Sequence, residues 1–196
     1  MIKLLIIDEI KKTVGFNFFY NKYFLDKEIK LDLGCGPWKK EGFIGIDNGE
    51  GAMQWKNIQG GKPVDMNYDL SKGIPFLDSS VEEIFAAHFM EHTDLMFMLK
   101  EVYRVAKPNA IFQFIVPYAN SAEGMFPGHN VFLTEKFFQQ NTLFNQLFKD
   151  VTFEFTPSDE WKNGELQKYI SMPFNTARIY FFNVCKWFTV NCRVNK

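Results

Sequence analysis

The sequence IKLDLGCG, residues 29–36, decides the fold of this chain. Its apolar run breaks at Asp32 into an acid-x-Gly-x-Gly turn, and a second apolar run, residues 43–47, ends in another acid, Asp47. Glycines at such a turn let the backbone approach a ligand, because no Cβ stands in the way. The acid that ends the second run can accept hydrogen bonds from both hydroxyls of a ribose. The stretch therefore predicts the nucleoside-binding edge of a doubly wound α/β sheet.

Composition and charge describe one ordinary globular domain. The chain has 196 residues, 46% of them hydrophobic, with a formal charge of −1 and a pI near 6.3. That length suits a single domain over residues 1–196 with a full core. No stretch approaches the roughly 20 apolar residues of a membrane span, and the charges of Asp8 and Glu9 argue against a signal peptide. The balanced charge disfavours a nucleic-acid partner.

Cysteine and phenylalanine usage adds further expectations. The three cysteines, Cys35, Cys185 and Cys192, show no metal-ligand spacing, and we expect no metal site. Their odd number fits a reducing compartment, so we expect a cytoplasmic protein. The 23 phenylalanines are far above ordinary usage and indicate either a Phe-rich core or a flat hydrophobic surface. For the Phe-rich segment 137–148 we expect the core.

The apolar pattern predicts how the chain divides. Residues 1–28 are expected to form a helical lead-in. The family resemblance described below implies that 29–117 form the half that binds the nucleoside and 118–196 the half that faces the substrate and completes the sheet. Strands are predicted at 29–33, 43–47, 65–69, 81–87 and 110–116, followed by two antiparallel strands at 151–155 and 184–194. Helices are predicted at 95–105 and 135–148. The fold class is therefore α/β, with a Rossmann-like, mostly parallel sheet and an antiparallel C-terminal pair.

One connection in this scheme is unusually short. Only nine residues separate Leu33 from Phe43, whereas a parallel crossover normally needs about a dozen or more. The first crossover helix must therefore be reduced to a turn, which we expect at 38–41. The later helix should end at Lys107-Pro108-Asn109, because proline cannot continue it and asparagine tolerates a left-handed turn.

Four blocks in this order resemble class I S-adenosylmethionine-dependent methyltransferases, in the type 11-like branch with a short first connection. The blocks are LDLGCGP (31–37) with GFIGID (42–47), DLSKGIPF (69–76), SVEEIFAAHFMEH (80–92) and EVYRVAKP (101–108). The resemblance covers residues 29–117, with a looser echo at 129–138. It implies the Rossmann-like class I methyltransferase sheet, S-adenosyl-L-methionine as cofactor and S-adenosyl-L-homocysteine as its product.

The resemblance also implies which residues bind the cofactor, namely Asp32, Gly34, Cys35, Gly36, Asp47, Asp69, Leu70 and His88. The glycine loop would pass beneath the methionine part, with Asp32 near the ammonium group or ordering the loop. Asp47 would accept the two ribose hydroxyls through charge-assisted bonds. Asp69 would accept from the adenine amino group, and the backbone N–H of Leu70 would meet a ring nitrogen. His88 would lie beneath the sulfonium and face the substrate.

The substrate side is expected to carry His92, Tyr118 and His129. The loop 119–130 follows the fifth strand, where this fold usually builds its substrate wall, and we favour a lid there over an idle connection. If the acceptor is a hydroxyl, a base helps to remove its proton, and His88 or His129 is the candidate. Each histidine also has a plainer interpretation, as a hydrogen-bonding group near a helix start.

The sequence thus predicts an enzyme, a methyltransferase that moves a methyl group to an oxygen or nitrogen of a small polar acceptor such as a sugar. The alternative is a catalytically silent relative that serves as a binding or scaffolding module. A nicotinamide-dependent oxidoreductase would need a third glycine and a full crossover helix, and both are missing. A monomer or homodimer is expected, since the aromatic segment 169–188 either pairs two subunits or completes the sheet.

Overall fold

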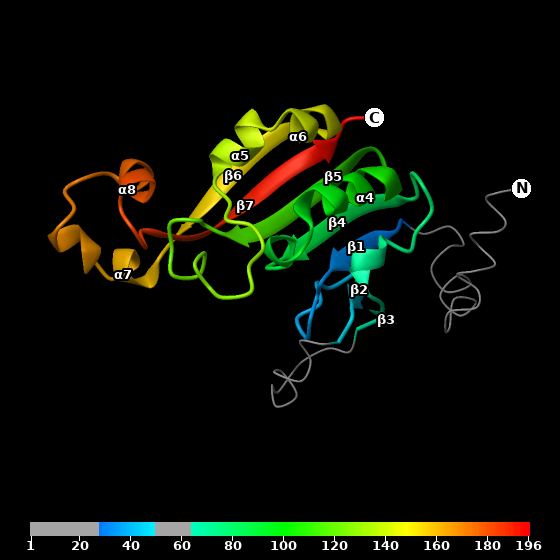
Figure 1. Cartoon of the computed structure of the whole chain (residues 1–196), viewed down its shortest axis with the longest axis horizontal. Coiled ribbons are helices and arrows are strands. Elements are labelled where there is room, and N and C mark those ends of the chain that lie inside the picture. The colour runs from blue at the N-terminus through cyan, green and yellow to red at the C-terminus, as the bar shows by residue number, and fades with distance from the viewer. Residues whose placement is uncertain (1–27, 50–63) are drawn as a thin grey trace, which may run out of the picture.

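A computed structural model of the chain describes residues 28–49 and 64–196. Its strands are β1 (Lys30–Leu33), β2 (Ile44–Asp47), β3 (Met66–Asn67), β4 (Val81–Ala87), β5 (Ala106–Pro117), β6 (Phe148–Pro157) and β7 (Cys185–Val194). In this part of the chain they form one sheet in the order β3-β2-β1-β4-β5-β7-β6 (Figure 1). The first five strands pair in parallel, and β7 runs antiparallel between β5 and β6. The predicted fold class is confirmed.

The first connection of the sheet is a turn, as its length required. Within residues 34–43 the described chain has turns and bends but no helix. The third strand, expected over 65–69, is shortened to two residues. Asp69 leaves the strand because its side chain accepts a hydrogen bond from the N–H of Ser71 and caps η1 (Leu70–Lys72), a short 3-10 helix. The helical lead-in expected at 1–28 lies outside the described residues, apart from Glu28.

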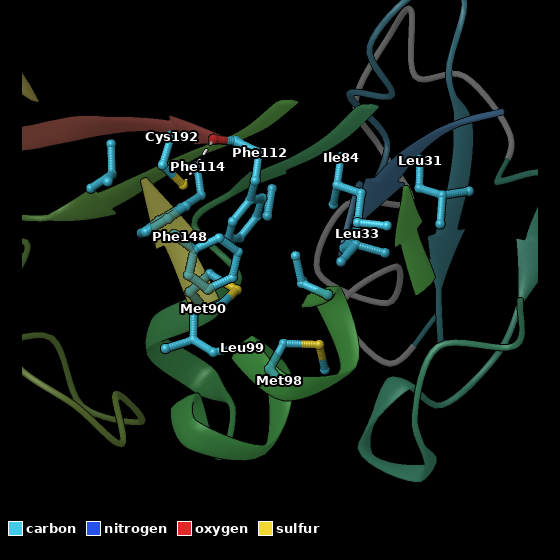
Figure 2. Packing of buried hydrophobic residues seen from close by; sticks show 14 of the residues in the cluster. Leu31, Leu33, Ile84, Met90, Met98, Leu99, Phe112, Phe114, Phe148 and Cys192 are labelled. Carbon is cyan, nitrogen blue, oxygen red and sulfur yellow. Dashed lines mark hydrogen bonds between the residues drawn. The ribbon is translucent and has the colours of Figure 1, made fainter. Parts of the chain in front are cut away.

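Helix α4 (Leu95–Val105) forms over the full length that the apolar spacing predicts. It begins where Asp94 accepts a hydrogen bond from the N–H of Phe97, and it ends before Asn109, whose φ of 61° is left-handed. Its buried stripe consists of Leu95, Met98, Leu99, Val102 and Val105. Figure 2 shows Met98 and Leu99 facing the strands that carry Leu33, Ile84 and Phe112. The helix therefore covers the middle of the sheet and holds the strand ends in place.

The helix predicted at 135–148 is wrong in one respect, because it is two short helices. α5 (Glu135–Gln140) ends at Asn141, and α6 (Thr142–Leu147) starts there. The Asn141 side chain accepts a hydrogen bond from the N–H of Phe144 at 2.9 Å. An asparagine in an extended conformation is a strong helix start, and here it overrides the continuous apolar pattern.

Phenylalanine fills the core of the sheet rather than a flat surface. The phenylalanines of β5, α5, α6, β6 and β7 that are fully buried are Phe112, Phe114, Phe138, Phe144, Phe148 and Phe188. Phe138 lies at the centre, with ring centroids 5.0 Å from Phe144 and 5.5 Å from Phe114. The expectation that segment 137–148 belongs to the core is confirmed.

A small unit between β6 and β7 extends beyond one end of the sheet (Figure 1). It contains α7 (Asp159–Lys162), the 3-10 helix η3 (Leu166–Lys168) and α8 (Phe174–Tyr180), packed around Trp161, Ile170, Ala177 and Val184. The first part of the aromatic segment 169–188 therefore belongs to this unit, and its last residues belong to β7 and complete the sheet. Among the described residues, no helix is long and apolar enough to cross a membrane.

Candidate active site

The candidate cofactor and substrate residues follow the ends of parallel strands. β1, β2, β4 and β5 end at Leu33, Asp47, Ala87 and Pro117. Because these strands pair in parallel, their carboxyl ends meet at one edge of the sheet, where open α/β sheets bind ligands. The glycine loop, Asp47, His88 and Tyr118 therefore start from the same edge.

The glycine loop after β1 needs glycine at two positions for different reasons. Gly34 has a φ of +62°, and a Cβ there would lie 2.2 Å from Cδ2 of Phe89. Its N–H donates to the carbonyl of Ile46 at 2.8 Å, which holds the loop against β2. Gly36 has a φ of +48° and open space where a side chain would stand. The loop is therefore packed tightly on one side and open at Gly36, as a loop beneath a ligand must be.

Cys35 lies between the two glycines and is buried. Its Sγ would be 2.7 Å from a Cβ on Gly45, so the sulfur occupies the space that this glycine leaves free. Burial raises the pKa of the Cys35 thiol to about 12, with nearby carboxylates adding to the effect. The side chain is thus a neutral filler of the loop.

Asp47 joins the two loops that border the expected ribose position. One carboxylate oxygen accepts from the N–H of Gly36 at 3.0 Å, and the other accepts from the N–H of Gly49 at 2.7 Å. Each carboxylate oxygen has a second lone pair, so both can still accept a hydroxyl proton. Asp47 is half-buried at the end of β2, where it can bind a ligand and order the loops together.

Asp32 is a buried acid beneath the glycine loop, only 2% exposed. Its Oδ2 accepts a hydrogen bond from the N–H of Lys40 at 2.7 Å, which ties the short first connection to β1. Burial raises the pKa of Asp32 to about 6, although the bond from Lys40 acts in the opposite direction. A cation brought close to this carboxyl would favour its charged form.

Asp69 and Leu70 lie after β3 at the expected adenine position. Asp69 is partly exposed, and the hydrogen bonds with Ser71 lower the pKa of its carboxyl. Its Oδ1 is used to cap η1, while Lys72 approaches Oδ2 at 3.5 Å. Leu70 is buried in the main core. Asp69 therefore does cap the following turn, which was the alternative to a cofactor role. Its carboxylate still has lone pairs that could accept a hydrogen bond from a ligand.

His88 follows β4 directly and has a left-handed φ of 52°. Its backbone N–H donates to the carbonyl of Ile115 at 2.9 Å, which fixes the turn against β5. Its ring lies edge to face with Trp187 at 5.3 Å, and its Nδ1 is 3.4 Å from a carboxylate oxygen of Glu91. The side chain is 44% exposed. His88 is therefore accessible, yet held by an aromatic ring and an acid.

All three histidines of the chain gather around Glu91. His92 follows it in the 3-10 helix η2 (Met90–His92), and His129 comes from the loop after β5. One ligand atom from each of Glu91, His92 and His129 lies within 4.8 Å of the others. Among the described residues, these acid and histidine side chains are close enough together to hold one metal ion.

Tyr118 and the loop 119–130 are more firmly held than an open substrate wall would be. Tyr118 is buried, and its hydroxyl donates to Glu135 and accepts from Arg178. The loop lies at the end of β5 (Figure 1) and is anchored by Asn130, whose N–H and side chain donate to the carbonyls of Glu91 and His92, both at 2.7 Å. Tyr118 thus orients α8, while the loop carries His129 toward the edge.

A hollow of about 400 Å³ borders the histidine cluster at the start of α4. It is lined by Thr93, Asp94, Leu95, Met96, Asn130, Val131 and Phe137. None of the residues expected to hold the cofactor lines it. The hollow is therefore separate from the glycine loop, and it lies beside Asn130, which directly follows His129.

Comparison with known proteins agrees with this arrangement. Residues 31–114 match the model of the family described as "Methyltransferase domain". This span runs from β1 through most of β5 and includes the glycine loop, Asp47, Asp69 and His88. Residues 31–114, less than half of the chain, match a methyltransferase domain of type 11. S-adenosylmethionine is the cofactor of such a domain, and solved proteins of this fold are described in complex with it or with S-adenosylhomocysteine.

Solved structures share the fold of this methyltransferase domain. One is a SAM-dependent methyltransferase of Archaeoglobus fulgidus, with a TM-score of 0.59, 19% identity and 90% of each chain covered. Another, from Thermotoga maritima, is described as a possible histamine N-methyltransferase, with a TM-score of 0.55, 16% identity and coverage of 86% of this chain and 83% of that one.

A third structure is a phosphoethanolamine N-methyltransferase of Haemonchus contortus in complex with phosphomonomethylethanolamine and S-adenosylhomocysteine. Its TM-score is 0.54 at 14% identity, over 92% of this chain and 52% of that one. At these identities the likeness concerns the fold. A search of curated proteins finds no significant match to the sequence.

No role was assigned to Glu91 from the sequence, although this residue belongs to the block 80–92 that supports the family resemblance. The residue stands out only in the structure, where Glu91 is 2% exposed although acids are normally exposed. Trp187, which holds the ring of His88, comes from β7 and is joined to it only by the tertiary fold. No local pattern could have indicated that contact.

Proposed function

We propose that this protein transfers the methyl group of S-adenosylmethionine to an oxygen or nitrogen of a small polar acceptor. The observation that carries the proposal is the meeting of two groups at one edge of the sheet. Gly36 and Asp47 form an open, hydrogen-bonding loop pair on the cofactor side. His88 and Glu91 form an accessible imidazole–carboxylate pair after β4. The strand order puts β1 between β2 and β4, so the two groups flank one position.

The cofactor would be held by the residues that border this position. Asp47 would accept from the ribose hydroxyls with the lone pairs that Gly36 and Gly49 leave free. Asp69 and the backbone of Leu70 would meet the adenine. Asp32 lies beneath the glycine loop, where a positively charged ammonium group would favour its ionised form. The backbone at Gly34, Cys35 and Gly36 would pass beneath the methionine part.

The reaction asks the protein mainly for positioning. S-adenosylmethionine supplies a methyl group that is already activated on a sulfonium. The chain's own residues would bring the acceptor atom into line and exclude water from it. His88 is favoured as the base for a hydroxyl acceptor, because its Nδ1 faces Glu91 and its second nitrogen remains for the acceptor. Glu91 would orient the ring and stabilise its charged form after it takes the proton.

The acceptor side would be formed by His92, His129 and the loop 119–130. The loop is tied to η2 through Asn130 and so closes one side of the position that His88 faces. Two proteins of this fold, one described as a possible histamine N-methyltransferase and one as a phosphoethanolamine N-methyltransferase, support a small polar acceptor. A sugar is a further member of that class. The balanced charge of the chain gives no support to a nucleic-acid acceptor.

The buried cysteines and the exposed tyrosines bear on location and assembly. All three cysteines are free and buried, which fits a reducing compartment, and we place the protein in the cytoplasm. The unit before β7 exposes Tyr169 and Tyr180, which is compatible with either a monomer or a homodimer.

Transfer of labelled methyl groups tests the proposed function. The protein is incubated with S-adenosylmethionine that carries a radioactive methyl group and with a panel of amines, sugars and other small hydroxyl compounds. We expect label in one acceptor class, and a loss of about 100-fold in rate for His88→Gln with the affinity for S-adenosylhomocysteine retained. His129→Gln is measured beside it. Unchanged turnover in both variants would remove the histidine base, and cofactor binding without transfer to any acceptor would favour a silent binding module.

A further inference from the structure

We propose that Glu91, His92 and His129 bind one divalent transition-metal ion on the acceptor side of the sheet edge. Their ligand atoms lie within 4.8 Å of one another, although the residues come from η2 and from the loop after β5. Two imidazoles and one carboxylate form a ligand set that suits first-row transition metals. No metal site was expected from the sequence, because the cysteines lack metal-ligand spacing. The present cluster contains no cysteine, so that reasoning did not cover it.

The carboxylate of Glu91 is the first reason for this proposal. The residue is 2% exposed, and within residues 28–49 and 64–196 neither of its side-chain oxygens has a hydrogen-bond partner. Buried carboxylates normally accept several hydrogen bonds or face a cation, because water no longer solvates them. The ring of His88 lies beside Glu91, with Nδ1 3.4 Å from one carboxylate oxygen. That contact reaches one oxygen and leaves the other without a partner.

The orientation of the two imidazoles is the second reason. Nδ1 of His92 lies 3.1 Å from the carbonyl oxygen of Gly128, and Nδ1 of His129 lies 3.1 Å from that of Gly124. A carbonyl oxygen can only accept, so each Nδ1 must carry the hydrogen. Each Nε2 then has a free lone pair. Proteins commonly orient metal-binding histidines in this way, with a backbone carbonyl behind the ring.

The backbone around the cluster holds its two halves together. Asn130 directly follows His129, and its N–H donates to the carbonyl of Glu91 at 2.7 Å. Its side chain donates to the carbonyl of His92, also at 2.7 Å. The two rings lie edge to face, with 4.8 Å between their centroids. The loop is therefore already seated on η2 before any ion binds.

Binding would require a small contraction of the cluster. Metal bonds of about 2.0–2.2 Å bring three ligand atoms to about 3–3.5 Å from one another. His92 is exposed and His129 is half-buried, so their rings can rotate by the ångström or so that this needs. Three protein ligands leave at least one coordination position open. An oxygen of the acceptor is the ligand we assign to it, and that assignment rests on the proposed function.

Titration of the purified protein with Co²⁺ tests the site directly. The protein is freed of metal with a chelator, and no S-adenosylmethionine or acceptor is added, so the result is independent of methyl transfer. We expect one Co²⁺ per chain, visible absorption bands of a low-symmetry complex, and a micromolar or lower Kd. Zn²⁺ should displace the Co²⁺. Wild-type protein that takes up neither ion overturns the proposal and leaves Glu91 paired with His88 alone.

Variants of the cluster identify the ligands. Glu91→Gln and His129→Gln should each weaken Co²⁺ binding by more than about 100-fold, whereas His88→Gln, the matched control, should keep it within about threefold. Equal loss in His88→Gln, or no loss in Glu91→Gln, contradicts the ligand set. Far-UV circular dichroism verifies each fold. If Glu91→Gln does not fold, the more exposed His92→Gln replaces it in the same comparison.

Discussion

The rings of His92 and His129 lie edge to face, with 4.8 Å between their centroids, although one follows β4 and the other follows β5. Each ring is held from behind by a carbonyl oxygen, that of Gly128 for His92 and that of Gly124 for His129. The contact closes the loop 119–130 onto the 3-10 helix that carries Glu91. The histidine cluster is therefore built by two segments that meet only in the folded chain.

Two glycines of the cofactor loop should respond differently to alanine. In Gly34→Ala the new Cβ meets the ring of Phe89 at 2.2 Å, so both a steric clash and left-handed strain arise. We expect a loss of about 2–4 kcal/mol in the free energy of unfolding. In Gly36→Ala the Cβ points into open space, so strain alone should cost about 1 kcal/mol. Urea unfolding measures both variants, and equal losses would contradict the packing of Phe89 against Gly34.

The same pair separates stability from ligand binding. Because the Cβ of Gly36→Ala enters the side on which the loop is open, this variant should lose most of its affinity for S-adenosylhomocysteine while it remains folded. Calorimetry of the folded variant provides the measurement. Affinity equal to that of the wild type would mean that the cofactor does not approach Gly36.

Asp32 should make stability fall as the pH rises. Its folded pKa is about 6, whereas the value in the absence of the fold is 3.8. Between these values the folded state holds the proton and the unfolded state releases it, so ionisation favours unfolding. Relative to Asp32→Asn, the wild type should lose up to about 3 kcal/mol between pH 4 and pH 7. Urea unfolding of both proteins across this range measures the difference, and a difference independent of pH would contradict it.

The buried ion pair between Glu135 and Arg178 should hold α8 to the rest of the domain. Its atoms are 2.7 Å apart, and both side chains are about one-tenth exposed. Arg178→Met leaves the Glu135 carboxylate unpaired, and we expect a loss of about 3–5 kcal/mol. The double variant Glu135→Gln with Arg178→Met should lose less than the sum of the single variants. Additive losses would show that the two charges do not interact.

An exposed ion pair of the same unit provides the control. Lys162 approaches Asp159 at 3.8 Å, and both side chains are at least half exposed. Lys162→Gln should therefore change the free energy of unfolding by no more than about 0.5 kcal/mol. A larger change would indicate that α7 depends on surface charge rather than on Trp161.

Phe138 should be the most costly aromatic side chain to remove from α5. It is 1% exposed and its ring contacts those of Phe114, Phe144 and Phe188. Phe138→Ala should lower the free energy of unfolding by about 3–5 kcal/mol. Phe132→Ala, at a side chain that is 57% exposed, should change it by about 0.5 kcal/mol or less. Similar losses in the two variants would contradict a Phe-rich core.

The sequence predicted the elements that are set by local periodicity. α4 has its predicted bounds because every apolar residue of the stripe packs on the sheet, and β4 is predicted over its full length. The break at Asn141 was missed because the apolar pattern continues through it, and only the capping bond reveals the new helix start. Shortening of β3 has the same origin at Asp69.

The candidate site divides in a similar way. Asp47 and His88 could be assigned because they end strands, and strand ends of a parallel sheet converge. The role of Glu91 could not, since it depends on burial and on His129 from a distant loop. Likewise, the buried position of Tyr118 results from Arg178, which approaches it from α8. Contacts between remote segments are a property of the fold rather than of any local pattern.

Calorimetric titration with S-adenosylhomocysteine tests the central claim most directly. The wild type should bind it with micromolar affinity and should not bind NAD, and Asp47→Ala should weaken binding by about 100-fold or more through the lost charge-assisted bonds. Asp65→Asn is the matched control, because Asp65 accepts from Gly45 and Lys39 beside β2 and should not reach the ligand. Absence of binding in the wild type, or equal affinity in Asp47→Ala, would contradict a functional cofactor site.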